Sequence, residues 1–542
     1  MALWPPPLGG FHRLEIADDI ALTLLFGDAE ETLRVADSGV GADAVFLDGF
    51  APQSNPAMWS EGLLAAVTRH CRPQSTLATW CVAGDIRRRL AALGWEVLRA
   101  PGFAAKRQML RGTLANARPS RPGRAATRSA VPPPLCFGGP REAIVIGAGI
   151  AGCAVAARLA ARGWTVTIID AHDAPAGGAS GNHAGILLPR LARDDALAAR
   201  LSRAAFLHAV RLLDDLGPTA WLPCGVLQLA ANEEDAAYQR DCIARGQFPA
   251  AFAQWLDAPA AHVRLGRGFA SPRDGGWWFP AGGRVAPALA CHALLTRDDG
   301  RITRRFGHSV RAIERDASGC WVVIGDDGAG GARGEPARAP QLVLACAERI
   351  PALLSPLLTA HLPLDRVRGQ TTTFDADACP PLDGLEIAVC GEGYVTPARE
   401  GRICIGASFH RGDGDLVERL ADHRANLARI ERLLPGSVDG LAPESCAGRV
   451  GVRATTPDRL PYAGLLPDVA VPVRGDPGLR GMPRMPGLSM IGGLGSRGLM
   501  WAPLAAEILV SRIAGEPLPV PRRFADALDP ARYYLRALRR LT

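Results

Sequence analysis

The sequence predicts an α/β protein in which a doubly wound dinucleotide-binding fold carries an inserted β-rich part and follows a partial Rossmann-like segment. Three observations lead to this prediction. A Gly-rich loop at 147–152 joins an apolar strand to a helix, strands and helices alternate between His12 and Arg111, and Pro- and Arg-rich sequence separates the two regions. Alternation of strands and helices is the layer pattern of proteins built on parallel sheets.

The composition is that of a soluble globular protein. The chain has 542 residues, of which 48% are hydrophobic and 21% charged, and a formal net charge of +7. At about 150 residues per domain this length predicts several domains. The positive charge is compatible with a polyanionic partner but does not require one.

The cysteines and the apolar stretches indicate in which compartment the protein is expected. The 13 cysteines include no Cys-x-x-Cys pair, so we expect no zinc ribbon, no iron–sulfur site and no bound metal. Reduced thiols and the absence of a secretion-signal pattern at the N-terminus favour the cytosol. No stretch reaches the ~20 apolar residues of a membrane span, and the uncharged run 143–157 is also too short.

The segment from Ala143 to Asp170 predicts a dinucleotide-binding βαβ unit. Gly147, Gly149 and Gly152 stand in Gly-x-Gly-x-x-Gly spacing between a strand and a helix, and the next strand ends in Asp170. Such glycines permit the tight turn, the approach of a pyrophosphate and close helix–strand packing, respectively. The helix N-terminus offers N–H groups to the phosphates, and Asp170 is expected to bind a ribose hydroxyl.

Two later loops favour FAD as the dinucleotide. Glycines and small polar residues fill 177–185 and 495–499, which suits a flavin ring lying against the backbone. A strand at 342–346 is expected at the centre of the sheet. In addition to the fingerprint, the expected cofactor-binding residues are Ser180, Gly181, Asn182, Val310, Gly495, Ser496, Gly498 and Leu499.

The first 112 residues contain a second α/β pattern. Strands are expected at 21–26, 44–48 and 76–81, and helices at 59–70 and 84–93. We expect the strand 44–48 to be buried. Asp48 ends this strand, where open parallel sheets place their ligands; a helix or turn cap is the alternative interpretation.

The next stretch, 113–140, predicts an extended linker. It contains Arg118, Arg121, Arg124 and Arg128 without an acid, and then Pro132–Pro134. Proline at this density favours an extended spacer. The arginines either contact phosphates or are simply solvated.

Short strings in the first region resemble a known family. Phe46–Pro52, Asn55–Trp59 and Lys106–Leu110 closely resemble the methyltransferase half of the bifunctional tRNA 5-methylaminomethyl-2-thiouridine biosynthesis proteins, the MnmC family. The resemblance implies methylation of an aminomethyl group on a wobble uridine of tRNA by S-adenosylmethionine.

The same resemblance assigns residues. It implies that Asp48 lies at the methyl-acceptor amine and that Lys106 and Arg107 lie on the tRNA side. An acid there suits an amine that must lose a proton. The family's Gly-rich S-adenosylmethionine loop has no counterpart ahead of Phe11, so we expect a shortened methyltransferase half with Asp28 as its cofactor-side acid.

The remainder of the chain is similar to the other half of this family. The strings are Val367–Gln370, Gly393–Pro397, Gly451–Pro461 and Gly495–Leu499. They resemble the oxidoreductase half and, more loosely, the glycine oxidase and D-amino-acid oxidase group. The resemblance implies FAD-dependent oxidation of 5-carboxymethylaminomethyl-(2-thio)uridine to the aminomethyl form, with glyoxylate released.

Oxidation of such an amine requires alignment of its carboxylate, which a guanidinium does best. The resemblance makes Arg453 the first candidate for this clamp and Arg497 the second, with Tyr394 closing it. Each has an alternative interpretation: an ion pair with Asp458 for Arg453, a phosphate or loop anchor for Arg497, and a core aromatic for Tyr394.

We therefore expect a methyltransferase-like part at 1–112, a linker at 113–140 and an oxidoreductase at 141–542. Within the oxidoreductase, FAD-binding parts are expected at about 141–220, 284–360 and 440–520, and substrate parts at about 221–283 and 361–440. Two alternatives remain open: a small-molecule glycine or D-amino-acid-type amine oxidase, and a non-catalytic, flavin-containing tRNA-binding protein.

Overall fold

The computed structural model describes residues 4–17, 20–37, 39, 41–102, 106–115, 140–266, 268–297, 300–327, 335–355, 357–358, 362–473 and 475–541. The linker expected at 113–140, with its four arginines, lies outside these residues from 116 to 139. No helix in the described ranges is long and apolar enough to cross a membrane. The cysteines of these ranges are all free thiols.

A doubly wound sheet organises the larger part of the chain. Among the described residues, six strands form it in the order β15-β8-β7-β19-β27-β26. They are β15 (Ile302–Arg305), β8 (Thr165–Ile169), β7 (Glu142–Ile146), β19 (Gln341–Leu344), β27 (Arg484–Gly492) and β26 (Tyr462–Pro467). All pair in parallel except β26 with β27. The chain order reverses at β7, and such a switch point places ligands at the carboxyl ends of the strands.

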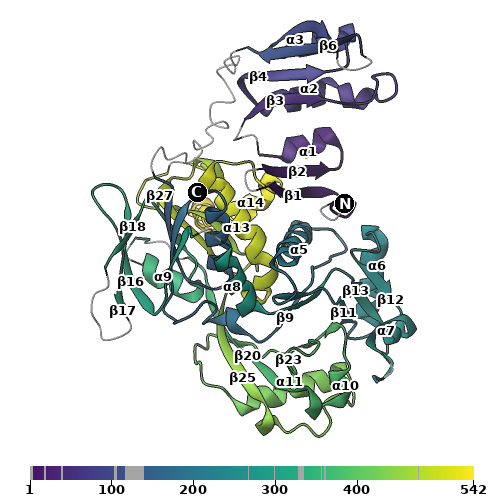
Figure 1. The fold of residues 1–542 in the computed structure, drawn as a ribbon, viewed down its shortest axis with the longest axis vertical. Helices are drawn as coiled ribbons and strands as arrows, with labels where there is room; N and C mark the ends of the chain where they lie inside the picture. The colour runs from purple at the N-terminus through teal and green to yellow at the C-terminus, as the bar shows by residue number, and fades with distance from the viewer. Residues whose placement is uncertain are drawn as a thin grey trace.

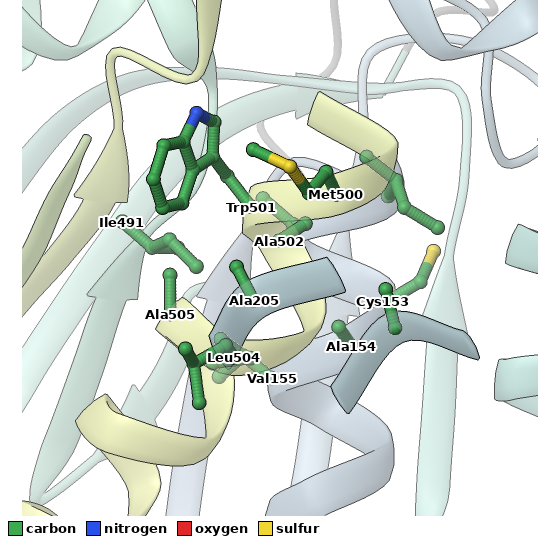
Figure 2. Close-up of a cluster of buried hydrophobic side chains, with 14 of the residues drawn as sticks. Cys153, Ala154, Val155, Ala205, Ile491, Met500, Trp501, Ala502, Leu504 and Ala505 are labelled. Atoms are coloured by element: carbon green, nitrogen blue, oxygen red, sulfur yellow. The ribbon is translucent and has the colours of Figure 1, made fainter. Parts of the chain in front are cut away.

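Most helices beside this sheet are largely apolar, whereas the one at Leu197–Leu216 is amphipathic and carries charged residues such as Arg200, Arg211 and Asp215. The helices are α4 (Ile150–Ala160), α5 (Leu197–Leu216), α8 (Pro287–Thr296) and α13 (Gly498–Ala514). Figure 2 shows how small side chains such as Ala154 on α4, Ala205 on α5 and Ala502 on α13 lie among larger ones in this core. A helix that is hydrophobic on every face must be buried, and α4 is buried over most of its length.

A second sheet forms the expected β-rich part. Nine strands in the described portion pair in the order β12-β13-β11-β21-β22-β23-β20-β24, with β25 also paired to β20. Their bounds are β11 (Val226–Leu229), β12 (Gln254–Leu256), β13 (Gly276–Phe279), β20 (Asp365–Asp375), β21 (Ala388–Cys390), β22 (Tyr394–Val395), β23 (Arg402–Gly406), β24 (His410–Arg411) and β25 (Ala447–Thr455). The expected β-rich stretches also contain helices, namely α6 (Glu233–Gly246), α7 (Ala258–Leu265), α10 (Pro380–Asp383) and α11 (Leu420–Leu433).

Smaller elements complete this body. Two three-stranded sheets have the orders β10-β14-β9 and β16-β17-β18 within the described residues. Their strands are β9 (Gly185–Leu187), β10 (Trp221–Leu222), β14 (Gly283–Val285), β16 (His308–Arg315), β17 (Trp321–Asp327) and β18 (Ala337–Ala339). The remaining helices are α9 (Ile350–Leu354), α12 (Gly478–Gly481), α14 (Arg522–Ala527) and α15 (Arg532–Leu541).

The N-terminal α/β segment lies at one end of the molecule (Figure 1). Four strands of its described part pair in the order β3-β4-β6-β5, with only β3 and β4 parallel. The elements are β3 (Ala42–Leu47), α2 (Glu61–Arg69), β4 (Cys71–Thr79), α3 (Gly84–Ala92), β5 (Trp95–Pro101) and β6 (Gln108–Leu114). The alternating strands and helices expected here are therefore present.

The expectation that strand 44–48 is buried is wrong. The strand is β3, which lies at the edge of the sheet beside β4 alone. Phe46 is 80% exposed. An apolar strand is buried only when other elements cover its faces, and here nothing in the described chain covers Phe46.

A β-hairpin links this segment to the large body. It consists of β1 (Gly10–Ala17) and β2 (Ile20–Phe26), which among the described strands pair only with each other, and α1 (Ala29–Val35) follows. In Figure 1 it lies between the four-stranded sheet and the helices α5 and α14. Buried Arg13 of β1 contacts Glu507 of α13, so the hairpin packs against the oxidoreductase-like body.

Candidate active site

A cavity of about 880 Å³ lies between the doubly wound sheet and the nine-stranded sheet. Its wall on one side consists of the turn after β7 and the loops 177–182 and 491–500, and on the other side of parts of β22 and β25. It therefore lies at the carboxyl ends of the parallel strands, where a doubly wound fold binds its ligand.

Three glycines shape the turn into α4. Gly147 has a φ of +107°, and a Cβ there would lie 2.6 Å from the oxygen of Ala345. A Cβ on Gly152 would lie 1.8 Å from the oxygen of Gly147. At Gly149 the nearest atom would be Oγ of Ser180 at 3.2 Å, so this position is open toward the cavity.

The same turn is braced by two side chains in the cavity wall. Ser180 Oγ accepts a hydrogen bond from the N–H of Ile150 at 3.0 Å. Asp170 Oδ2 accepts from the N–H of Ala148 at 2.6 Å, and its Oδ1 accepts from the N–H of His172 at 2.9 Å. Both side chains line the cavity together with Asn182.

The loop after Asp170 is held by Arg449, which sequence reasoning missed. Nη2 of Arg449 donates to the backbone oxygens of Gly177 at 2.7 Å and Gly178 at 3.2 Å. A Cβ on Gly181 would lie 2.0 Å from this guanidinium, so Gly181 makes room for it; unlike its neighbours, it does not line the cavity.

A sequence signal for Arg449 exists. Arg449, Gly451 and Arg453 alternate along β25, and alternate residues of a strand point to the same face. A Cβ on Gly451 would lie 2.8 Å from Cα of Ala179. One face of β25 thus contacts the 177–181 loop and also carries Arg453.

Arg453 lines the cavity without a protein carboxylate beside it. Within the described residues its guanidinium forms no ion pair, and burial lowers its pKa. The alternative interpretation, an ion pair between Arg453 and Asp458, is not found, because Asp458 pairs with Arg532 at 3.1 Å instead. A Cβ on Gly369 would lie 2.6 Å from Nη2 of Arg453, so that glycine makes space for the guanidinium.

Tyr394 of β22 and Arg497 of the 491–500 loop also line the cavity. Burial raises the pKa of Tyr394 well above its usual value, and its hydroxyl donates to the oxygen of Ala184 at 3.3 Å. Burial and nearby Arg190 lower the pKa of Arg497. Like Arg453, Arg497 has no carboxylate partner in the part of the chain that the structure describes.

The remaining expected residues of the large body also lie at the cavity. Gly495 has a φ of +57°, which the turn into α13 requires. The expected cofactor-binding residues of this late loop and of β16 that line the cavity are Gly495, Ser496, Gly498, Leu499 and Val310. Gly152, like Gly181, does not line the cavity; it packs under the turn that begins at Gly147.

The cavity residues fit a flavin dinucleotide. Gly149 leaves an open backbone cradle at the N-terminus of the 11-residue helix α4, and such a terminus favours a pyrophosphate. The glycine loops provide flat backbone for a ring. The two arginines without carboxylate partners in the described residues both line the cavity and favour an additional anion.

The structure does not bring the N-terminal candidates to this cavity. Asp28 caps α1, accepting from the N–H of Glu31 at 2.9 Å. Asp48 is exposed just after β3. The adjacent Gly49 oxygen accepts from Nε1 of Trp80 at 3.2 Å, and Lys106 Nζ lies 4.8 Å from the centre of the Trp80 ring.

Comparisons with known proteins agree with both regions. Residues 142–512 match the FAD dependent oxidoreductase family, and residues 1–115 match the S-adenosyl-L-methionine-dependent methyltransferase family. Among solved structures, iminodiacetate oxidase from Chelativorans sp. BNC1 has a TM-score of 0.57 at 24% identity, covering 71% of this chain and 98% of that one. Glycine oxidase from Geobacillus kaustophilus has a TM-score of 0.55 at 21% identity, covering 69% and 94%. These structures show the fold.

Relatives match nearly the whole chain. The tRNA 5-methylaminomethyl-2-thiouridine biosynthesis bifunctional protein MnmC of Cupriavidus necator is 44% identical over 99% of this chain and 81% of its own length. The protein of the same name from Aromatoleum aromaticum is 43% identical with the same coverage. The chain therefore belongs to the MnmC family of bifunctional tRNA 5-methylaminomethyl-2-thiouridine biosynthesis proteins, with an FAD dependent oxidoreductase region joined to a methyltransferase-family region.

Proposed function

We propose that this protein acts in the cytosol on the wobble uridine of tRNA. It oxidises 5-carboxymethylaminomethyl-(2-thio)uridine to 5-aminomethyl-(2-thio)uridine. The carbon between the secondary amine and the carboxylate loses two electrons and a proton, water then cleaves the carbon–nitrogen bond, and the carboxymethyl part leaves as glyoxylate. When bound, FAD supplies the two-electron acceptor for this step.

One observation carries the proposal: Arg453 and Arg497 present guanidinium groups to the cavity without a protein carboxylate in the described chain. A substrate carboxylate satisfies such a group through paired, charge-assisted hydrogen bonds. Arg453 is our clamp residue, because Gly369 leaves space around its Nη2. Arg497, between the late glycine loop and α13, is the second cation.

Tyr394 closes the clamp as a hydrogen-bond donor once its single hydroxyl hydrogen turns from the Ala184 oxygen to the substrate carboxylate. Its raised pKa keeps the hydroxyl protonated at neutral pH, so it donates to an oxygen and does not act as a base. The reaction makes few demands on acid–base groups, and these three residues act chiefly by aligning the reacting carbon.

At the end of the cavity formed by the glycine turns, backbone groups of the protein would hold the cofactor. Gly149 and the first turn of α4 would hold the pyrophosphate. Asp170 would face a ribose while its two oxygens fix Ala148 and His172. The 177–182 loop, held by Arg449, and the 495–499 loop would lie against the flavin ring.

Methyl transfer to the aminomethyl product is the second candidate function. The match of residues 1–115 to the S-adenosylmethionine-dependent methyltransferase family favours it. Asp48 would accept the amine proton, Lys106 and Arg107 would face tRNA, and Asp28 would lie on the cofactor side.

Nucleoside analysis tests both steps. The flavin-loaded protein is incubated with tRNA carrying 5-carboxymethylaminomethyluridine, with and without S-adenosylmethionine, and the digested nucleosides are separated. The aminomethyl nucleoside is the expected product without the methyl donor, and the methylaminomethyl nucleoside with it indicates methyl transfer. Recovery of unchanged substrate from both reactions would refute the proposed oxidation.

A further inference from the structure

An ordered loop with exposed apolar side chains borders the cavity. It spans 407–419, between β23 and α11, and includes the two-residue strand β24. Phe409 and Leu416 line the cavity although they are 47% and 64% exposed. Val417 beside them is also exposed. Large apolar side chains that gather in water at the mouth of a binding cavity indicate a contact surface.

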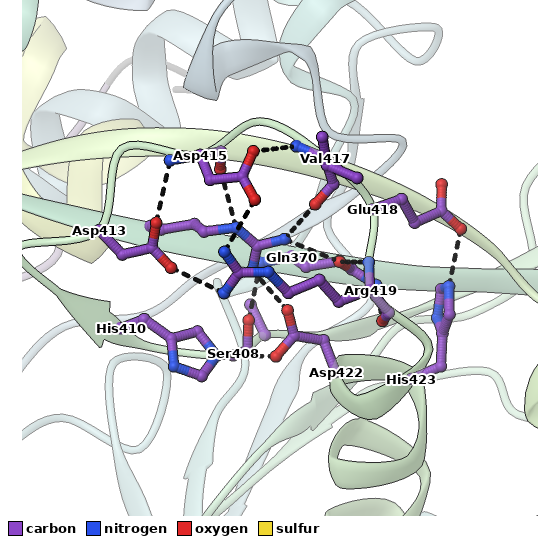
Figure 3. Close-up of polar contacts among 12 residues, drawn as sticks. Gln370, Ser408, His410, Asp413, Asp415, Val417, Glu418, Arg419, Asp422 and His423 are labelled. Atoms are coloured by element: carbon purple, nitrogen blue, oxygen red, sulfur yellow. Dashed lines mark hydrogen bonds and ion pairs between the residues drawn. The ribbon is translucent and has the colours of Figure 1, made fainter.

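Buried Arg368 fixes the backbone of this loop. Its Nε donates to the oxygen of Asp415 at 2.8 Å and its Nη2 to the oxygen of Val417 at 2.5 Å. Gln370, also buried, accepts from the N–H of Arg419 at 2.8 Å and donates to the Arg419 oxygen at 2.9 Å. Figure 3 shows these bonds converging on the loop from β20.

Carboxylates complete the network. Asp422 of α11 accepts from Nη1 of Arg368 at 2.5 Å and lies 2.7 Å from Nε2 of His410. Arg419 donates to Asp413 at 2.7 Å and to Asp415 at 2.8 Å (Figure 3). Burying a charged guanidinium such as that of Arg368 is costly unless its N–H groups are hydrogen-bonded. Here those hydrogen bonds go to the backbone oxygens of Asp415 and Val417 in the loop. The shape of the loop is therefore strongly specified.

Acids and bases both lie around the loop, but its acids already have partners, because Asp413 and Asp415 pair with Arg419, and Glu418 lies 2.8 Å from Nε2 of His423. Arg366 lines the cavity, and Arg411 lies two residues after Phe409. In the described ranges neither side chain forms an ion pair. Arg429, another lining residue, donates to the oxygens of Ala407 and Asn426 but to no carboxylate described here. Glu392, the nearby lining acid, is paired with Arg432 at 2.9 Å.

An apolar surface with Arg366 and Arg411 near it fits an unstacked nucleobase between two phosphates. Proteins read single-stranded RNA by stacking splayed bases on flat side chains while cations bind the backbone. In the proposed reaction, one methylene joins the base to the amine. With the carboxylate at Arg453, the base is only a few bonds away, and because it remains attached to the RNA it lies on the side of the cavity that opens to solvent.

We propose that Phe409 and Leu416 hold the nucleobase of the modified uridine at the cavity mouth, and that Arg366 and Arg411 bind the flanking phosphates. Arg368 and Gln370 are positioning residues for this platform. The inference rests on the proposed function. It adds a site for the base and phosphates of the RNA, separate from the clamp that binds the carboxylate of the reacting amine.

Kinetics with a modified RNA test the platform. The substrate is an anticodon stem-loop that carries 5-carboxymethylaminomethyluridine. For Phe409→Ala we expect KM to rise by about 10-fold, as for loss of one base stack, with little change in kcat. Phe409→Trp should restore the KM. Val263→Ala on α7, where the side chain is 79% exposed and outside the cavity lining, is the matched control and should resemble wild type.

Flavin absorbance and thermal unfolding show whether each variant is folded and loaded. A loaded Phe409→Ala protein with wild-type KM would overturn the platform while leaving the proposed oxidation intact. A loaded wild-type protein that does not oxidise the stem-loop would overturn the proposed function, and the platform with it.

Salt dependence tests the phosphate contacts. Arg366→Gln should flatten the dependence of log kcat/KM on log salt concentration by about 0.7. Arg424→Gln is the control, because Arg424 is exposed and paired with Glu444. Equal salt slopes for Arg366→Gln and wild type would overturn the assignment of Arg366.

Discussion

Nε of Arg158 donates to Oε2 of Glu507 at 2.8 Å, joining α4 to α13, the two helices that begin at the glycine loops of the cavity. Oε1 of the same carboxylate accepts from Nη2 of Arg162 at 2.7 Å and lies 3.5 Å from Nη1 of Arg13 on β1. Glu507 is fully buried. One carboxylate thus connects the N-terminal hairpin with both cofactor-facing helices.

Replacing Glu507 should destabilise the whole body. Glu507→Gln leaves Arg13, Arg158 and Arg162 without their shared anion, and removing one partner of a buried pair costs about 3–5 kcal/mol. Urea unfolding followed by circular dichroism measures this loss. Glu444→Gln removes an exposed pair with Arg424 and should cost less than ~1 kcal/mol; equal losses in the two variants would contradict the account.

The contribution of Glu507 to the free energy of unfolding should depend on pH. Burial opposes its ionisation, but Arg158 and Arg162 outweigh burial and hold its pKa well below the usual range. Its stabilisation is therefore complete above the unfolded-state pKa of about 4.3 and is lost as the pH falls below that value. The difference in unfolding free energy between wild type and Glu507→Gln should shrink between pH 7 and pH 3.5. A constant difference would show that Glu507 does not carry this charge.

Removing the clamp guanidinium should abolish turnover and spare the flavin. Arg453→Ala loses two charge-assisted hydrogen bonds to the substrate, and we expect kcat/KM to fall by at least about 100-fold. The visible spectrum of the purified variant should match wild type. Oxidation of the modified tRNA at a near wild-type rate would exclude Arg453 as the clamp.

A side chain at Gly149 should prevent flavin binding without disrupting the fold. A Cβ there meets only Ser180 Oγ at 3.2 Å, but it fills the backbone cradle for the pyrophosphate. We expect Gly149→Val to purify without flavin yellow and to unfold cooperatively. Gly384→Val, where no atom lies within 4 Å of the added Cβ, should remain loaded. A fully yellow Gly149→Val protein would rule out this cradle.

Tyr394 should act as a neutral donor at every working pH. Because burial raises its pKa well above 10, the alkaline limb of the kcat/KM profile cannot arise from its ionisation. Tyr394→Phe should lower kcat/KM by about fivefold through one lost hydrogen bond and leave that limb at the same pH. Loss of the limb in the variant would identify Tyr394 as the titrating group.

The local part of the site could be predicted from the sequence. The turn from β7 to α4 depends on Gly147, Gly149 and Gly152, which lie within five residues of one another. Because the whole turn lies in one short segment, its sequence pattern is enough to predict it. The strand expected at 342–346 is β19 in the parallel sheet, paired with β7 and β27.

Long-range register could not be predicted. Arg449 reaches the 177–178 loop because nine residues of β20 pair with β25, and that register is set by the whole sheet. Arg368 was part of a family string, but its role in holding Val417 depends on the return of the chain 49 residues later. The exposure of Phe46 depends on which elements cover β3, and the strand's apolar sequence alone cannot show this.

Anaerobic mixing of the flavin-loaded protein with modified tRNA tests the central claim most directly. The account predicts loss of the visible flavin absorbance and release of one glyoxylate per flavin with tRNA carrying 5-carboxymethylaminomethyluridine, and neither with unmodified tRNA. Unchanged absorbance with the modified tRNA, together with bleaching by free glycine, would contradict the account and identify a small-molecule amine oxidase instead.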